Sequence, residues 1–223
     1  MARQNICAAA LATLVFSAAG TAGAWDGDSI TTVSGTITVS AGEHRGDVST
    51  VNGSVKVGEN AVVGHAHTVN GSVTLEARAT ATEVKTVNGA VRLDEGAQVS
   101  GGVRTVNGAL TLAKDASVTG GLGNVNGGIR VNAAHVGGDV ETVTGGIELG
   151  PDAHVDGGVT VRKEHSSDSD TRTPPRIVIG PGSVVKGTLR FERRVELYVS
   201  DRATIGPVEG ATPIKFSGDH PPG

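Results

Sequence analysis

Residues 86–99 read TVNGAVRLDEGAQV and hold the two patterns that decide the fold. The first pattern is the tripeptide Val-Asn-Gly, and related Val-Ser-Gly and Val-Thr-Gly tripeptides stand on either side of the series. The seven tripeptides begin at Val33, Val51, Val69, Val87, Val106, Val125 and Val143. Their starts are separated by 18, 18, 18, 19, 19 and 18 residues. A repeat this short cannot bury a face alone, so its units must stack on one another.

The second pattern is an alternation of apolar and other residues, as in Val91-x-Leu93 and Ala97-x-Val99. Period two is typical of β-strands, and three short strands in 18 residues make one turn of a coil. Aliphatic residues recur at fixed places in every repeat. One such column holds Ile37, Val55, Val73, Val91, Leu110, Ile129 and Ile147, and another holds Val39, Val57, Leu75, Leu93, Leu112, Val131 and Leu149. We therefore predict an all-β, single-stranded parallel β-solenoid, a triangular β-helix with 18–19 residues per coil.

The composition agrees with this prediction. The 223 residues include 34 glycines but only five Phe, Trp and Tyr residues. The lumen of so narrow a coil has room for Val, Ile, Leu and Ala, while glycine suits corners with close backbone approach. The formal charge of −4 argues against a nucleic-acid partner, which would call for a basic surface.

The asparagines of the tripeptide fall at one corner of the predicted coil. They are Asn52, Asn70, Asn88, Asn107 and Asn126. Asparagine tolerates the left-handed backbone conformation that a corner can require. Stacked amides can also hydrogen-bond from coil to coil. We predict a structural asparagine ladder rather than a ligand site.

The remaining segments divide the chain. Residues 1–24 combine Arg3, an apolar run and Ala22-Gly23-Ala24, the layout of a cleavable signal peptide. We expect export, with the periplasm as the first location and the cell surface or the medium as alternatives. Residues 25–208 form the predicted solenoid, and the polar stretch 163–175 forms a loop extruded from it. Residues 209–223 are a proline-rich tail expected to leave the stack.

The stretches Gly108–Gly120 and Ile177–Leu189 resemble the repeat of bactofilins, a polymer-forming bacterial β-helix family. The shared pattern is two alternating aliphatics, a short turn, a small residue, an aliphatic residue and glycine. The Thr-Val-Asn-Gly-x-Val units are similar to putative-adhesin β-repeat proteins of bacterial envelopes. The bactofilin resemblance implies a right-handed solenoid and end-to-end polymerisation without a nucleotide. Bactofilins are typically cytoplasmic or bound to the inner face of the membrane, whereas this chain has a predicted export signal.

A search of the outward positions gives one candidate metal site. Asp47, His65, His67 and Glu83 fall on adjacent coils in neighbouring columns. Carboxylate and imidazole groups are suitable ligands for a divalent ion. The alternative is a solvated face of mixed charge. Asp139 and Glu141 also share an outward face, at a separation that glycoside hydrolysis can use, but no aromatic residue lies near them in the pattern.

The sequence thus favours a non-enzymatic envelope protein that acts as a scaffold, adhesin or self-assembling element. Its expected partners are other copies, contacted through the open solenoid ends, and cell-envelope components, with no cofactor. One alternative is a metal- or ligand-binding periplasmic protein that uses the face of Asp47, His65, His67 and Glu83. A less favoured alternative is a hexapeptide-repeat acyltransferase, which also has 18-residue coils. The predicted export away from acyl-CoA and the lack of a helical pattern argue against this enzyme.

Overall fold

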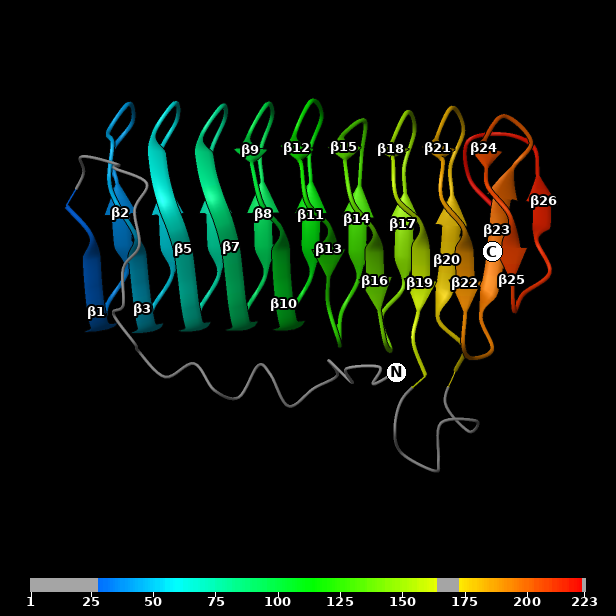
Figure 1. Cartoon of the computed structure of the whole chain (residues 1–223), viewed down its shortest axis with the longest axis horizontal. Coiled ribbons are helices and arrows are strands. Elements are labelled where there is room, and N and C mark those ends of the chain that lie inside the picture. Colours follow the sequence, from blue (N-terminus) through cyan, green and yellow to red (C-terminus); the bar gives the residue numbers. More distant parts are fainter. Residues whose placement is uncertain (1–27, 164–172, 222–223) are drawn as a thin grey trace, which may run out of the picture.

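The computed structural model describes residues 28–163 and 173–221. The predicted signal peptide and most of the predicted loop at 163–175 lie outside these residues. The described chain consists of β-strands without a helix, so it contains no helix that could cross a membrane. All pairings between its strands are parallel, and the strands stack in about ten coils along one axis (Figure 1). The prediction of an all-β parallel solenoid is confirmed.

One sheet runs the whole length of the stack and receives one strand from each coil. Its ten strands are β2 (Ile37–Val39), β4 (Val55–Val57), β6 (Val73–Leu75), β8 (Val91–Leu93), β11 (Leu110–Leu112), β14 (Ile129–Val131), β17 (Ile147–Leu149), β20 (Arg176–Ile179), β23 (Glu196–Ser200) and β26 (Ile214–Phe216). Most of these strands show a buried–outward–buried pattern, which is the period-two signature that the sequence predicts.

The second sheet begins as one row and divides into two. The undivided part holds β1 (Ile30–Ser34), β3 (Val48–Asn52), β5 (Val62–Asn70) and β7 (Thr80–Asn88). One arm then holds β9 (Gln98–Val99), β12 (Ser117–Val118), β15 (His135–Val136), β18 (His154–Val155), β21 (Val184–Val185) and β24 (Thr204–Ile205). The other arm holds β10 (Val103–Asn107), β13 (Leu122–Gly123), β16 (Val140–Thr142), β19 (Val159–Val161), β22 (Leu189–Phe191) and β25 (Val208–Glu209).

The division of this sheet follows from one inserted residue. Ala81 pairs with Val99 and Val84 pairs with Val103, so three residue steps in β7 correspond to four in the next coil. The extra residue lies in Ser100-Gly101-Gly102, between β9 and β10. Because β7 has no such insertion, it continues as one nine-residue strand. The first 19-residue spacing of the repeat therefore marks the place where a straight strand becomes a corner.

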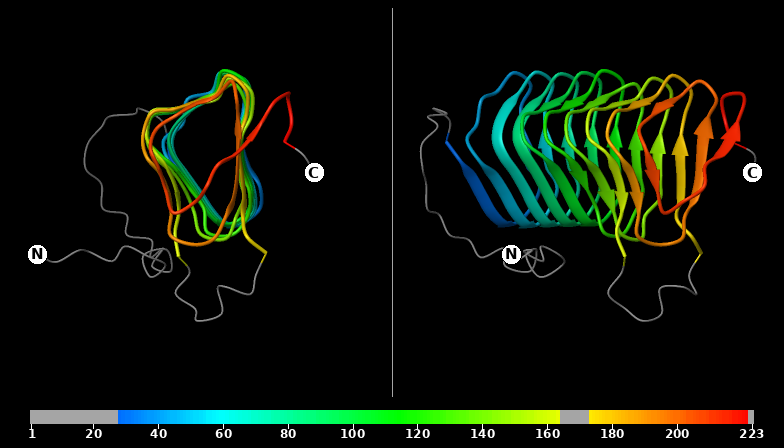
Figure 2. Two further views of the ribbon diagram at one scale, coloured as in Figure 1. Left: turned by 90° about the vertical axis from the view of Figure 1, so that its right-hand side faces the viewer. Right: turned by 45° about the vertical axis from the view of Figure 1, so that its right-hand side comes forward.

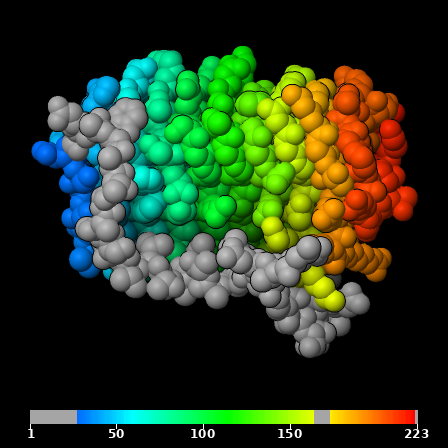
Figure 3. Space-filling model, viewed as in Figure 1, coloured from blue at the N-terminus to red at the C-terminus, as the bar shows by residue number. Residues whose placement is uncertain are grey.

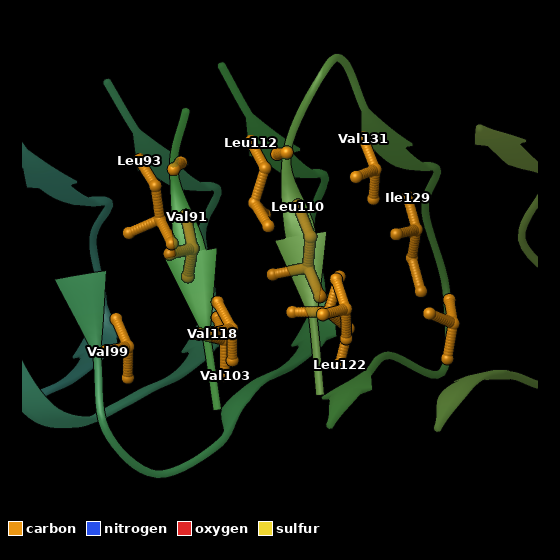
Figure 4. Close-up of a cluster of buried hydrophobic side chains, with 14 of the residues drawn as sticks. Val91, Leu93, Val99, Val103, Leu110, Leu112, Val118, Leu122, Ile129 and Val131 are labelled. Carbon is orange, nitrogen blue, oxygen red and sulfur yellow. The ribbon is translucent and has the colours of Figure 1, made fainter. Parts of the chain in front are cut away.

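The predicted aliphatic columns fill the interior of the stack. The side chains of Val91, Leu93, Leu110 and Leu112 are at most 1 % exposed, and Figure 4 shows how they stack on their counterparts in the next coil. Parallel pairing in register places each side chain over its equivalent, one strand spacing away. The core is therefore a continuous column of Val, Ile, Leu and Ala, as the scarcity of aromatic residues predicts.

The left-handed residues stand at a different corner from the predicted one. The asparagines of the tripeptide do not have positive φ angles. Instead, a turn after the strands of the first sheet carries residues with φ between 44° and 70°. These are Gly42, Asn60, Arg78, Gly96, Asp115, Ala133, Asp152 and Gly182. The residue types in this column vary, so the sequence pattern does not reveal it.

The C-terminal segment is part of the solenoid. The sequence analysis ends the solenoid at residue 208 and treats 209–223 as a tail, but β26 pairs with β23 and extends the stack to Phe216. The segment between β25 and β26 crosses the end of the stack (Figure 2). Val208 and Ala211 pack there against the core. Because β26 has only three residues and prolines stand near it, the sequence pattern does not predict this strand. The space-filling view shows the coils as successive bands of one elongated body (Figure 3).

Candidate functional site

The five predicted ladder asparagines form an unbroken chain of side-chain hydrogen bonds. The Nδ2 atoms of Asn70, Asn88, Asn107 and Asn126 each donate to Oδ1 of the asparagine one coil earlier, at 2.9 Å. Each amide can donate and accept simultaneously, so a single column satisfies both groups. These amides bind one another, which supports a structural role.

A second ladder lies beside the first and was missed by the sequence analysis. Thr50, Thr68, Thr86 and Thr105 are at most 2 % exposed. Each hydroxyl donates to the carbonyl oxygen of a tripeptide glycine in the preceding coil, at 2.7–3.3 Å. The signal was available, because a threonine precedes Val-Asn-Gly in four of the five repeats. Buried polar groups require such partners.

The predicted metal-binding residues lie together on the outer face of β5 and β7. Asp47, just before β3, accepts hydrogen bonds at Oδ1 from the backbone N–H of His65 (2.8 Å) and lies 2.9 Å from its Nδ1 atom. Lys85 Nζ lies 2.6 Å from Glu83 Oε2, whereas His67 Nε2 lies 4.0 Å from the same oxygen. The face is thus arranged as two clusters, Asp47 hydrogen-bonded to His65 and Glu83 ion-paired with Lys85.

Electrostatics agrees with this pairing. Partial burial opposes ionisation of Asp47, but the hydrogen bonds from His65 outweigh it and lower the pKa of Asp47. Burial, followed by the nearby charge of Lys85, lowers the pKa of His67. Its Nε2 atom is buried and lacks a hydrogen-bond partner among the described residues. Within residues 28–163 and 173–221, no group of three or more His, Cys, Asp and Glu side chains is placed to hold a metal ion.

A polar groove of about 380 Å³ lies over β16, β19 and β22. Its lining includes Asp139 and Glu141, which the sequence analysis considered for sugar hydrolysis. Glycines at positions 157, 158 and 187 leave the floor without side chains. The charged groups on its walls largely satisfy one another. Arg162 donates to Glu141 at 2.7 Å, and Asp139 accepts from the backbone N–H of Gly158 at 2.7 Å. A ligand would have to displace these bonds.

The two ends of the stack differ. At the first coil, β1 pairs only with β3 and β2 only with β4 among the described strands, and at the last coil β24, β25 and β26 likewise have one partner each. The ends differ in the side chains and segments that lie there. Val33 in β1 is 68 % exposed and Ile214 in β26 is 47 % exposed, and they are the exposed large hydrophobic residues of the described chain. They stand at opposite ends of the rod. The last coil is crossed by the segment before β26 (Figure 2).

Comparison with known proteins found no match for this chain. No protein-family model, curated protein or solved structure matches the chain. The resemblance to bactofilins and to putative adhesins therefore rests on the repeat pattern alone. The solenoid and its hydrogen-bond ladders are the observations from which a function must be argued.

Proposed function

We propose that the chain is a non-enzymatic structural protein of the bacterial envelope, a rigid rod that is exported and associates with a second copy through its first coil. The single observation that carries this proposal is the unpaired, apolar edge at β1. An edge strand with free backbone groups is a template for pairing with another strand. Stacked coils with continuous ladders supply the rigidity that a scaffold needs.

Val33 shows why the first coil favours association. It occupies the position that Val51 and Val69 occupy in the next two coils, where these valines are half-buried. Val33 is exposed because no described coil precedes it. A partner strand laid against β1 would bury this side chain and pair the free backbone edge. Both effects stabilise the associated state.

The last coil is less suitable for growth. Lys215 pairs with Val199, which belongs to the buried column, so a charged residue stands at the end of an otherwise aliphatic row. Charged residues on edges are a common device against strand-to-strand association. We therefore expect rods joined in pairs through their first coils, rather than the polymer that the bactofilin resemblance implies.

The rival functions have weaker support. Asp47 already accepts hydrogen bonds from His65 and Glu83 is already ion-paired with Lys85, and zinc would have to replace these partners. In the groove over β19, both arginines already have ion-pair partners, Arg162 with Glu141 and Arg190 with Glu209. An acyltransferase would need acyl-CoA, and the predicted export argues against this enzyme.

Sedimentation velocity over a wide concentration range tests the proposal, with chelator and zinc as additional conditions. We expect a monomer–dimer equilibrium that is indifferent to both additions. Val33→Asp places a charge on the first coil and should weaken association at least tenfold, equivalent to about 1.4 kcal/mol. Ile214→Asp is the matched control at the other end and should leave association unchanged.

Three results would overturn the proposal. One is a protein that stays monomeric at all concentrations. Another is an equal effect of both substitutions. The third is a melting temperature that rises with zinc and returns in His65→Ala, which would favour the metal-binding function.

A further inference from the structure

The Val-Asn-Gly repeat places five copies of a chemically labile sequence in one folded chain. In an Asn-Gly pair, the backbone nitrogen of glycine can attack the side-chain carbonyl of the preceding asparagine. Glycine offers the least steric hindrance to this attack, because it lacks Cβ. The five pairs begin at Asn52, Asn70, Asn88, Asn107 and Asn126. All five share the tripeptide Val-Asn-Gly, although Asn126 is flanked by Asn124 and Gly128 where the others have threonine and serine or alanine. Unfolding the chain therefore separates the effect of the fold from that of the flanking residues.

Four of the pairs have their attacking nitrogen held by the next coil. The backbone N–H groups of Gly53, Gly71, Gly89 and Gly108 donate to the carbonyl oxygens of Asn70, Asn88, Asn107 and Asn126 at 2.9–3.0 Å. These bonds direct each nitrogen towards the next coil and away from its own asparagine side chain. The side chains are fixed as well, because their amides belong to the ladder. Attack therefore requires local opening of the stack, which costs free energy.

The fifth pair stands where the ladder ends. Residue 144 is threonine, and its backbone N–H donates to the carbonyl oxygen of Val125 at 2.9 Å. Within the described part of the chain, the N–H of Gly127 makes no hydrogen bond. Gly127 has a φ angle of 125°, whereas the four other glycines do not have positive φ. Asn126 and Gly127 are both exposed to solvent.

We propose that Asn126 is a site of spontaneous deamidation that reacts well before the other four asparagines. The Gly127 nitrogen loses its proton to water or hydroxide and forms a bond to Cγ of Asn126. The bond from Cγ to Nδ2 breaks, and ammonia leaves with a proton from solvent. Water then opens the resulting five-membered imide at either carbonyl and gives aspartate or isoaspartate.

The hydroxyl of Thr144 also lies within hydrogen-bond distance of Oδ1 of Asn126. A donor at this oxygen stabilises the negative charge that develops there when the nitrogen attacks. The same hydroxyl contacts the carbonyl oxygen of Val125 at 2.9 Å, so it holds the end of the ladder close to the reacting group. Thr144 is thus a positioning residue for the reaction.

The reaction would change the ladder at its last bond. Asn126 Nδ2 donates to Asn107 Oδ1 at 2.9 Å, and deamidation replaces that donor by a carboxylate oxygen. Two acceptors would then face each other, one of them charged. The last ladder bond would be lost while the bonds from Asn107 back to Asn52 remain.

Peptide mapping by mass spectrometry on the folded full chain, aged in mildly alkaline buffer, tests the proposal. Deamidation at Asn126 should be at least tenfold faster than at any of the other four sites, which corresponds to about 1.4 kcal/mol of opening free energy. The four other Asn-Gly pairs are controls within the same molecule. In concentrated urea, all five sites should react at similar rates. Asn126→Gln should remove the fast event without accelerating the others.

Rates within threefold of one another in the folded chain would overturn the proposal, as would a different site reacting first. The same holds if Asn126 reacts no faster than the other sites but all five accelerate in urea. Thr144→Val separates the contribution of the hydroxyl. It should slow reaction at Asn126 and leave the other four rates unchanged.

Discussion

In four of the five Val-Asn-Gly tripeptides, the glycine is required by close backbone approach and not by an unusual φ angle. A Cβ atom built on Gly89 would lie 2.0 Å from the carbonyl oxygen of Gly71, and one on Gly71 would lie 2.0 Å from that of Gly53. The tripeptide glycines thus stack on one another at the corner of the coil. The hydroxyls of the threonine ladder donate to the carbonyl oxygens of these same glycines. Glycine packing and the threonine ladder therefore meet at one corner, beside the asparagine ladder.

Gly89→Ala should therefore destabilise the protein by about 3 kcal/mol, because the backbones of two coils must separate to admit a methyl group. Urea denaturation followed by circular dichroism measures the change. Gly123→Ala is the matched control, since its Cβ would meet only the Cγ atom of Arg104 at 3.7 Å. Equal losses in the two variants would contradict the close-approach argument.

Ala133 illustrates the other corner, where residues adopt positive φ. Its φ angle is 44°, a conformation that costs a non-glycine residue about 1–2 kcal/mol. Ala133→Gly should raise the free energy of unfolding by about 1 kcal/mol, after the greater entropy of the unfolded glycine chain is considered. Thermal denaturation checks this sign. Ala113→Gly, at a position with negative φ, should change stability in the opposite direction.

His67 makes stability depend on pH in a defined direction. Because burial and Lys85 lower its pKa, the unfolded chain binds this proton more readily than the folded chain. Stability should fall between about pH 7 and pH 5, by at most about 1.4 kcal/mol per pH unit for one proton. The carboxylates with lowered pKa, Glu43, Asp47 and Asp156, act in a more acidic range.

Urea denaturation at several pH values tests this expectation. His67→Gln should flatten the dependence in that window, whereas His154→Gln, on an exposed part of β18, should leave it as in the unmodified chain. An unchanged slope in His67→Gln would show that another group is responsible.

At the scale of the strands, one residue decides whether a coil bends. β5 and β7 are nine residues long, and the next coil breaks into β9 and β10 at Ser100-Gly101-Gly102. Gly101 also permits a close approach, because its Cβ would lie 2.7 Å from the carbonyl oxygen of Thr82. The strands remain in register on both sides of the break, so a corner is added without loss of the core.

The threonine ladder gives a test of how the strands are joined. Thr86 in β7 is 2 % exposed, and its hydroxyl donates to the carbonyl oxygen of Gly71 at 2.9 Å. Thr86→Val keeps the shape but leaves this carbonyl without the hydroxyl, which should cost about 1–3 kcal/mol. Thr82→Val, in the same strand but half-exposed, is the control and should be close to neutral. Chemical denaturation of both variants decides between a structural ladder and incidental contacts.

At the scale of the whole molecule, the two ends determine how the rod behaves. Among the described strands, β1 and β26 are each paired on one side only, but the edge strand β26 carries Lys215 in register with Val199, whereas β1 carries the exposed Val33. Deleting residues 211–223 would remove β26 and expose the edge of β23. We expect increased self-association in sedimentation velocity, because the unpaired edge at this end would then carry Val199 in place of Lys215.

A chain shortened only by residues 221–223 is the control for this deletion and should behave as the full chain does. If removal of β26 leaves the association unchanged, the last coil is not a barrier to growth. Lys215 would then not explain why association occurs through the first coil and not through the last.

The sequence by itself determined the solenoid, its inward columns and the asparagine ladder, because a short exact repeat leaves one register in which every aliphatic residue is buried. Only the tertiary structure decided what the repeat does not encode. The residues with positive φ differ in type from coil to coil, and the residues of β26 depart from the repeat, so the sequence pattern predicts neither feature. The pairing of Lys85 with Glu83 within β7, and of Asp47 with His65 across two coils, depends on side-chain geometry. Among the described residues, the N–H of Gly127 makes no hydrogen bond whereas those of its four counterparts do, and the shared tripeptide does not reveal this difference because it depends on the backbone of the following coil.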